Sequence, residues 1–308
     1  MSYHLDKISE KKVRRSEQTT PGHSEKLCAK AASGNADMVM LDLEDACAVS
    51  QKVDARKVVG KALAENDWGQ KIRGFRANNI RTIWCLDDII EVLTIARDAV
   101  DVIVIPKVYG PEEIHYYDFL FNQLEYKLNM KKQVKFEVLI ESAAAALKAY
   151  DIAKASPRMD ALIFGIADYA GDVNARVMKG DEQFQVFHWA KSQVVTAARA
   201  ALIDSIDNVT LDYKDLDQVR KDAINARNMG FDGKWCIHPT HVEVVNEVFT
   251  PSDEEIKRAT EIIGAYDKAD KEQGLGAITF GTEMVDAATL RVERWKLSIA
   301  KRVGKIRA

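Results

Sequence analysis

Two carboxylates follow apolar, strand-like segments of this 308-residue chain. Glu141 comes directly after segment 136–140, and Asp168 comes shortly after segment 161–165. Because the ends of successive parallel strands meet at one rim, we expect the two carboxylates to be neighbours facing one cavity. Two carboxylates with room for water ligands suit Mg²⁺ or Mn²⁺, which prefer hard oxygen ligands. The alternative is that each acid caps the helix that follows it.

Three further acids, Asp42, Glu44 and Asp45, stand at the end of the apolar segment 38–41. Burying them without a counter-charge would be costly, so we expect them to meet a cation, a metal-bound water or an arginine. Arg76 is the candidate partner, because its planar fork can bind a carboxylate in bidentate fashion. Beside a metal, the same fork could hold the carboxylate of an α-keto acid. A purely structural salt bridge is the alternative.

A lysine and a histidine also follow apolar segments. Lys107 could form a Schiff base if burial lowered its pKa. It stands at an exposed strand end among acids, however, and we expect a salt bridge with Glu44, Asp45 or Glu141. His238 is expected to be a hydrogen-bonded structural residue. The chain contains no HExxH, GxSxG, P-loop or GxGxxG motif, which argues against zinc proteases, serine hydrolases, P-loop NTPases and Rossmann enzymes.

The elements that must position these residues read as eight short strands separated by helical segments. The predicted strands are 15–20, 38–43, 72–77, 101–106, 135–141, 160–166, 201–206 and 233–238. The first has the weakest signal because it is polar. Alternating strands and helices with charged strand ends predict an α/β fold, a (β/α)8 barrel with its active site at the strand C-termini. We place the catalytic barrel at 1–250 and a helical extension, acting as a lid or subunit arm, at 251–308.

Residues that favour helix starts support the predicted helices. Ser24 is expected to cap a helix, and Pro111 suits a first helical turn. Thr240 and Ser252 each precede a glutamate by three positions, which predicts capping boxes.

Composition is that of a globular protein that can bury a sizeable core. The chain is 47% hydrophobic and 30% charged, with a net charge of −3, so nothing indicates nucleic-acid binding. The four cysteines, at positions 28, 47, 85 and 236, form no CxxC pair, which favours reduced thiols. Segment 1–15 lacks the apolar core of a secretory signal, and no apolar run could cross a membrane. We therefore expect a cytoplasmic protein.

Several motifs occur together in a recognisable order. They are Leu41-Asp42-Leu43-Glu44-Asp45, Arg76-Ala77-Asn78, Ile105-Pro106-Lys107-Val108, Ile140-Glu141-Ser142, Gly165-Ile166-Ala167-Asp168, Ile237-His238-Pro239 and Met284-Val285-Asp286. Over roughly residues 15 to 295 the chain resembles the citrate lyase β-subunit-like branch of the HpcH/HpaI aldolases. Segments 66–70 and 248–253 look most similar to the malyl-CoA, β-methylmalyl-CoA and citramalyl-CoA lyases of that branch.

The resemblance implies a role for each matched residue. It implies Mg²⁺ on Glu141 and Asp168, with Glu44 and Asp45 near the waters of the metal. Arg76 would contact the keto acid and the enolate oxygen. The remaining implied assignments are an acid/base that comes from a neighbouring chain, Asp286; contacts with coenzyme A, Arg15 and Lys30; and a substrate-site cation, Lys107.

The implied activity is Mg²⁺-dependent cleavage or formation of a 3-hydroxyacyl-CoA from an acyl-CoA and a small α-keto acid, glyoxylate or pyruvate. The implied assembly is a homotrimer or homohexamer. Family members usually have an apolar strand before Pro21-Gly22, whereas this chain has Glu17-Gln18-Thr19-Thr20. Three alternatives stay open: a citrate lyase β subunit acting on an acyl-carrier protein, a malyl-CoA thioesterase, and a non-enzymatic binding subunit.

Overall fold

The structure, a computed structural model, describes residues 12–306. They form two compact units: the larger spans Arg14–Phe249, and the smaller contains the described residues 12–13 and 250–306. Within the described part of the chain, no helix has both the length and the apolar character that a bilayer crossing requires.

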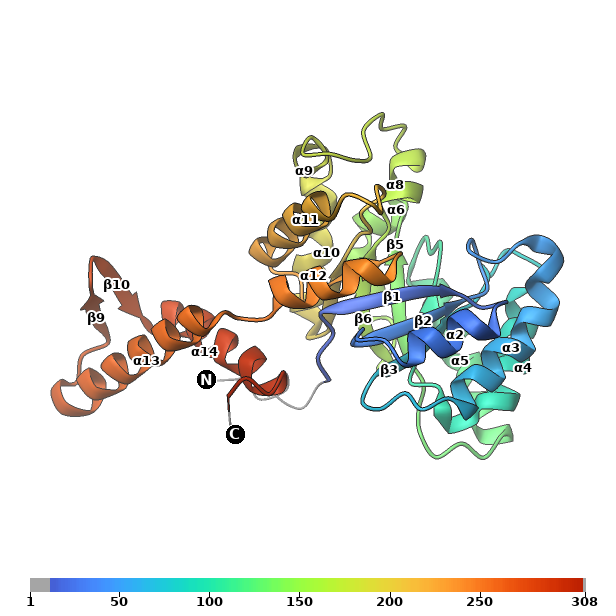
Figure 1. Cartoon of the computed structure of the whole chain (residues 1–308), viewed down its shortest axis with the longest axis horizontal. Coiled ribbons are helices and arrows are strands. Elements are labelled where there is room, and N and C mark those ends of the chain that lie inside the picture. The colour runs from blue at the N-terminus through green and yellow to red at the C-terminus, as the bar shows by residue number, and fades with distance from the viewer. Residues whose placement is uncertain (1–11, 307–308) are drawn as a thin grey trace. The chain divides into compact units, whose positions relative to one another are not determined.

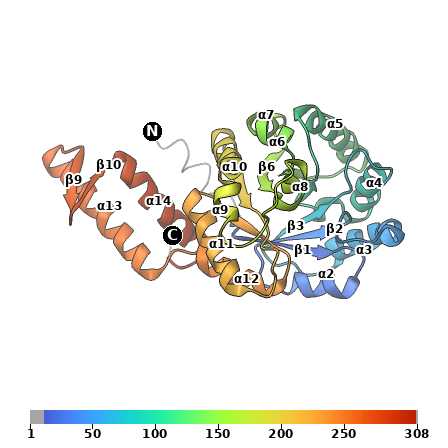
Figure 2. The ribbon, with the colours of Figure 1, turned by 90° about the horizontal axis from the view of Figure 1, so that it is seen from above.

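The larger unit is a closed barrel of eight parallel strands that pair in the order β1 to β8. Figure 2 shows helices surrounding these strands. The strands are β1 (Ser16–Pro21), β2 (Met38–Asp42), β3 (Ile72–Arg76), β4 (Val102–Ile105), β5 (Lys135–Ile140), β6 (Met159–Phe164), β7 (Asp204–Asp207) and β8 (Gly233–Cys236). The predicted (β/α)8 barrel is confirmed.

The helices of this unit fill the connections between consecutive strands, as a parallel barrel requires, and α12 follows the last strand, β8. They are α2 (Glu25–Ala32), α3 (Lys52–Glu65), α4 (Cys85–Ala96), α5 (Pro111–Lys127), α6 (Ala143–Leu147), α7 (Ala149–Lys154), α8 (Ile166–Asp172), α9 (Gln183–Val186), α10 (His188–Ala201), α11 (Leu216–Met229) and α12 (Pro239–Phe249), with the 3₁₀ turns η1 (Val49–Gln51) and η2 (Arg97–Ala99). The side chain of Ser24 caps α2, and Pro111 opens α5, as predicted. The capping box expected at Thr240 is wrong, because α12 already begins at Pro239.

The core lies on both sides of the barrel wall. All residues of β2 and β4 are buried, because side chains from other strands fill the interior and helices cover the outside. The predicted β7 is shifted: α10 runs to Ala201, and Leu202 ends it in the left-handed conformation with φ of 64°. The strand therefore begins at Asp204 instead of 201.

β1 is a strand despite its polar sequence. It pairs with β2 on one side and β8 on the other, which satisfies its backbone hydrogen bonds. Two of its buried polar side chains lie near polar groups: the Ser16 hydroxyl donates to Asn246 Oδ1 at 2.7 Å, and the Glu17 carboxyl group lies 3.8 Å from Arg14 Nε. Pairing with two neighbouring strands therefore fixes β1 as a strand, whereas burial of apolar side chains indicates the other strands.

The smaller unit contains two helices and a β-hairpin: α13 (Asp253–Gln273), β9 (Ala277–Phe280), β10 (Glu283–Asp286) and α14 (Ala287–Arg302) (Figure 1). The capping box predicted at Ser252 is present at the start of α13. Ile262, Val285 and Leu290 form a small apolar cluster that joins both helices to the hairpin.

Candidate active site

The charged strand ends gather at the C-terminal rim of the barrel. Asp42 is the last residue of β2 and Arg76 the last of β3, and the strand register places them side by side. Glu141 directly follows β5. Asp168 lies in the first turn of α8, which follows β6. The structure therefore brings together the acids and the arginine that the sequence singled out.

Asp42 holds the Arg76 guanidinium from the side. Arg76 Nε donates to Asp42 Oδ1 at 2.7 Å, and Nη2 donates to Oδ2 at 2.6 Å. The backbone N–H groups of Glu44 and Ala46 also donate to this carboxylate, each at 2.9 Å. Burial disfavours the charged carboxylate, but the charge and hydrogen bonds of Arg76 outweigh it and lower the pKa of Asp42. Asp42 is an anchor that orients Arg76.

The rest of the guanidinium faces Glu44 and an aromatic ring. Arg76 Nη1 lies 3.0 Å from Glu44 Oε2, so the predicted ion pair between Arg76 and the acids is present. The guanidinium lies over the ring of Trp235 on β8, 5.4 Å from its centroid, and the Trp235 indole N–H donates to the Thr19 hydroxyl. With Asp42 on one edge and Trp235 on one face, Arg76 is held in a defined orientation.

Glu141 is a buried carboxylate, only 4% exposed. Desolvation, followed by the negative charges of Glu44 and Asp168, raises its pKa to about 8. Its Oε1 accepts the backbone N–H of Lys107 at 2.6 Å. The alternative that Glu141 caps the next helix is wrong, because Ser142 is the N-cap of α6 and its side chain accepts from Ala145 N.

Two backbone features shape the surroundings of Glu141. Lys107 has a φ of 53°, an uncommon conformation for a residue with a side chain, and this conformation accompanies the bond from its N–H to Glu141. A Cβ atom on Gly165 would lie 2.6 Å from Glu141 Oε2, so only glycine leaves room for the carboxylate. The chain between β6 and α8 therefore approaches Glu141 closely.

The Lys107 ammonium group lies among the remaining acids. Its Nζ is 2.9 Å from Glu44 Oε1, 3.2 Å from Asp45 Oδ1 and 3.9 Å from Asp168 Oδ1. Burial would lower the pKa of Lys107, but the hydrogen bond and charge of Glu44 and the charges of Asp45 and Asp168 raise it above its ordinary value. A protonated amine is not a Schiff-base nucleophile, and the expected salt bridge is confirmed for Glu44 and Asp45.

The donor set fits a hard divalent cation. Five carboxylates, three of them buried, face two cationic side chains at this rim: Asp42, Glu44, Asp45, Glu141 and Asp168 against Arg76 and Lys107. Burial, and then the negative charges of Glu44 and Asp168, raise the pKa of Glu141, and a bound cation would offset those charges. No three His, Cys, Asp or Glu side chains within residues 12–306 form a preassembled metal cluster. Glu141 and Asp168 are the residues that could hold the ion, with water completing its coordination.

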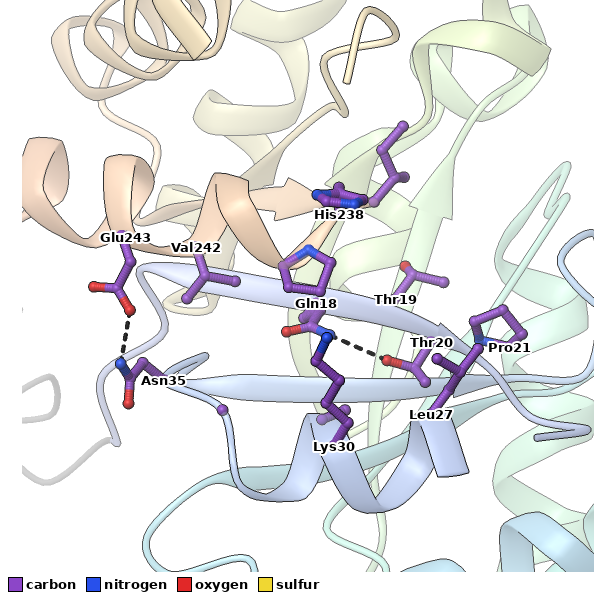
Figure 3. A pocket seen from close by; sticks show the side chains of 14 residues that line it. Gln18, Thr19, Thr20, Pro21, Leu27, Lys30, Asn35, His238, Val242 and Glu243 are labelled. Carbon is purple, nitrogen blue, oxygen red and sulfur yellow. Dashed lines mark hydrogen bonds between the residues drawn. The ribbon is translucent and has the colours of Figure 1, made fainter. Parts of the chain in front are cut away.

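Lys30 lies on the wall of a separate cavity of about 420 Å³ between α2 and the start of α12. Figure 3 shows Lys30 and His238 on opposite sides of it, with Gln18, Thr19 and Thr20 of β1 between them. The His238 ring bonds the Thr240 hydroxyl at 2.8 Å, consistent with the structural role predicted for it. This cavity is the place in the larger unit where a ligand could contact Lys30.

Two predicted site residues lie elsewhere. Arg15 precedes β1 at the opposite, N-terminal rim, where its Nε donates to Asp37 Oδ2 at 2.8 Å. The structure therefore gives no support to the coenzyme A contact expected of Arg15. Asp286 is in the smaller unit and is the N-cap of α14, with Oδ1 accepting from Ala288 N at 2.9 Å and Thr289 N at 3.0 Å. The cap alternative for Asp286 is confirmed, and its catalytic role stays a prediction.

Sequence reasoning missed two residues that shape the site. Successive side chains of a strand point to opposite faces, so the period of two could have placed Trp235 of β8 in the barrel interior. Gly165 directly follows β6, and a glycine at a strand end signals a close approach of another group.

Comparison with known proteins shows what the chain resembles. Residues 19–239 match the family model described as HpcH/HpaI aldolase/citrate lyase. The L-malyl-CoA/beta-methylmalyl-CoA lyase of Rhodobacter capsulatus is 34% identical over 94% of this chain and 96% of its own length. The (3S)-malyl-CoA thioesterase of Cereibacter sphaeroides is 32% identical over 92% of this chain and 93% of its own.

A solved structure extends the match to the whole fold. The protein CitE from Mycobacterium tuberculosis, in complex with magnesium, acetoacetate and coenzyme A, is 25% identical and superimposes with a TM-score of 0.77, over 95% of this chain and 98% of its own. The family match covers well over half of the sequence, and the similarity to the lyase from Rhodobacter capsulatus runs nearly end to end. The chain therefore belongs to the HpcH/HpaI aldolase/citrate lyase family and is a carbon–carbon lyase.

Proposed function

We propose that the protein is a Mg²⁺-dependent lyase that cleaves or forms a 3-hydroxyacyl-CoA such as malyl-CoA, β-methylmalyl-CoA or citramalyl-CoA. The partners of the reaction are an acyl-CoA and a small α-keto acid, glyoxylate or pyruvate. The observation that carries the proposal is the orientation of Arg76 by Asp42 and Trp235, beside the buried Glu141. The similarity to a malyl-CoA lyase and to a complex with magnesium and coenzyme A supports the substrate class and the metal.

The chemistry divides between two halves of the substrate. In cleavage, the 3-hydroxyl group loses its proton and the C2–C3 bond breaks, which gives an α-keto acid and the enolate of an acyl-CoA. The enolate then takes a proton on its α-carbon. A divalent cation bound by Glu141 and Asp168 would supply Lewis acidity toward the keto acid oxygens.

Arg76 stabilises the negative charge that develops during bond cleavage. Its orientation is fixed by Asp42 before the substrate arrives, so little reorganisation is needed at the moment of reaction. Burial opposes the charge on the guanidinium, but Asp42 and Glu44 raise its pKa and keep it protonated. Glu44 and Asp45 hold the Lys107 ammonium group at the same rim, where it adds positive charge next to the keto acid.

Asp286 is the proposed acid/base for the α-proton of the acyl-CoA, which it removes in synthesis and returns in cleavage. The backbone N–H groups of Thr289 and Ala288 lower its pKa, so the carboxylate is ionised near neutral pH and can accept a proton. We propose that residues 251–308 contact a neighbouring subunit of a homotrimer or homohexamer and supply Asp286 to its site. Lys30, on the wall of its own cavity, is the proposed contact for coenzyme A.

Product analysis tests the proposal. Purified protein with Mg²⁺ is incubated with acetyl-CoA or propionyl-CoA and with glyoxylate or pyruvate, and the products are followed by mass spectrometry. The mass of a new 3-hydroxyacyl-CoA is expected for at least one pair. Free hydroxy acid with free coenzyme A would indicate instead a thioesterase, the activity named for one relative. No product with any pair would contradict the proposal and favour an acyl-carrier-dependent citrate lyase subunit.

A further inference from the structure

Lys52 is a buried lysine beneath the acidic rim. It is the first residue of α3 and only 5% exposed. A cation at a helix N-terminus opposes the helix dipole, and lysine is rarely buried without specific partners. The position therefore goes against two local preferences, which indicates that this ammonium group serves contacts outside its own helix.

Its three N–H donors are all used, and all three acceptors are uncharged oxygens. Lys52 Nζ donates to the backbone carbonyl of Leu43 at 2.8 Å, to the carbonyl of Glu44 at 2.6 Å and to Asn78 Oδ1 at 2.6 Å. The ammonium group also lies 5.4 Å from the centroid of the Trp84 ring. Lys52 thus joins the chain that follows β2 to the chain that follows β3.

Asn78 extends this connection into a buried network. Its Nδ2 donates to the Leu43 carbonyl at 2.9 Å and to Asp88 Oδ2 at 2.7 Å, and its backbone N–H donates to the same Asp88 oxygen at 3.0 Å. Asp88 is fully buried and accepts from Arg56 Nε at 2.8 Å. Side chains from α3 and α4 therefore hold the two segments that carry the rim residues.

The segment whose carbonyl groups bind Lys52 includes Glu44. The Glu44 carboxylate reaches Arg76 Nη1 at 3.0 Å and Lys107 Nζ at 2.9 Å, so the direction of its peptide groups decides where both cations are held. We propose that Lys52 is a positioning residue, which fixes the Leu43–Glu44 carbonyls and thereby keeps Glu44 between Arg76 and Lys107. It acts through Glu44 and does not touch the substrate. This inference rests on the proposed function and assigns Lys52 to the half of the site that binds the keto acid.

The test compares Lys52→Met with a second buried lysine. Methionine keeps an unbranched apolar side chain and removes the charge and the three donors. Lys191 is also fully buried, with Nζ 2.7 Å from Asp207 Oδ1, but it lies on α10 and pairs with the end of β7 instead of the segment that carries Glu44. Lys191→Met therefore controls for the loss of a buried charge. Asp88→Asn, which weakens the network and leaves Lys52 in place, serves if Lys52→Met does not fold.

We expect Lys52→Met to raise the KM for the keto acid at least tenfold, with the KM for the acyl-CoA within twofold of wild type. Lys191→Met should leave both KM values unchanged, because a loss of folded protein alone lowers only the apparent kcat. Wild-type KM for the keto acid in Lys52→Met, or an equal rise in both KM values, would overturn the proposal. Asp88→Asn should also raise the KM for the keto acid more than the KM for the acyl-CoA, but by a smaller factor.

A crystal structure of Lys52→Met separates this proposal from the proposed function. In this variant we expect the distance between the Glu44 carboxylate and Arg76 Nη1 to exceed about 4 Å, so that the ion pair is lost. An unmoved Glu44 would overturn the positioning role. If wild-type protein forms no product with any substrate pair, the proposed function fails, and the position of Glu44 in the variant alone decides whether Lys52 positions it.

Discussion

Removing the charge of Asp42 should disable Arg76 without removing it. In Asp42→Asn, one of the two oxygens that Arg76 contacts becomes an NH₂ group, which faces a donor. Breaking a buried ion pair in this way costs about 3–5 kcal/mol, and we expect the lower end, about 3 kcal/mol, because one oxygen acceptor remains. For a domain of this size, that corresponds to a fall in Tm of about 6–12 °C.

The same substitution should also lower kcat, because Arg76 loses its fixed orientation. Loss of one preorganised group that stabilises developing charge lowers kcat by about 10²–10³, and with Arg76 still present we expect about 10². The KM for acyl-CoA should not change, because Lys30 and its cavity are separate from this pair. Steady-state kinetics below the Tm of the variant, together with thermal unfolding, measure both effects.

The matched control is Asp101→Asn. Asp101 also pairs with an arginine of β3, accepting from Arg73 Nε at 3.1 Å, but it precedes β4 at the opposite rim. The hydrogen bonds of Arg73 and Lys132 outweigh burial and lower its pKa to about 2. Its loss should lower Tm and leave kcat unchanged. If Asp42→Asn kept the wild-type kcat, or if both variants lost activity equally, Arg76 would not need its anchor.

Two further predictions concern buried carboxylates. Burial and the charge of Glu137 raise the pKa of Glu17, and burial raises the pKa of Glu137 to about 7. The folded protein therefore keeps protons that the unfolded chain loses, so stability falls as pH rises from about 4.5 toward 7. Glu17→Gln cannot ionise, and its Tm advantage over wild type should grow between pH 5 and pH 8; an equal difference at both pH values would refute this. Gly165→Ala places a Cβ 2.6 Å from Glu141 Oε2 and should lower lyase activity at least tenfold, whereas Gly171→Ala, which has open space, should not; equal activities would contradict the close-packing argument.

The charged strand ends could be predicted from sequence because a parallel barrel brings them to one rim whatever the details of packing. Arg76 was expected to pair with the acids at the end of β2, and it pairs with Asp42 and Glu44. The separate roles of these acids could not be predicted, because they depend on which carboxylate binds Nε and Nη2 of Arg76. In the structure that partner is Asp42, through both oxygens, and Glu44 is left to join Arg76 with Lys107.

Other features escaped prediction for physical reasons. The polar β1 carries little periodic signal, and only its pairing with β2 and β8 makes it a strand. The coenzyme A contact of Arg15 was expected from the family resemblance alone and stays a prediction, and strand direction puts this residue, which precedes β1, at the rim opposite the site. Lys52 lies at a helix start, where local rules favour an acid, so its contacts with Leu43 and Glu44 can be found only in three dimensions.

The central claim is that Glu141 and Asp168 hold a divalent cation beside Arg76 for carbon–carbon bond chemistry. The most direct measurement is Mn²⁺ binding to wild type, Glu141→Ala and Asp168→Ala by electron paramagnetic resonance, with Mg²⁺-dependent product formation followed on the same samples. We predict that wild type binds the ion and that each alanine variant loses both binding and activity. Undiminished binding and full metal-dependent activity in both variants would contradict the account.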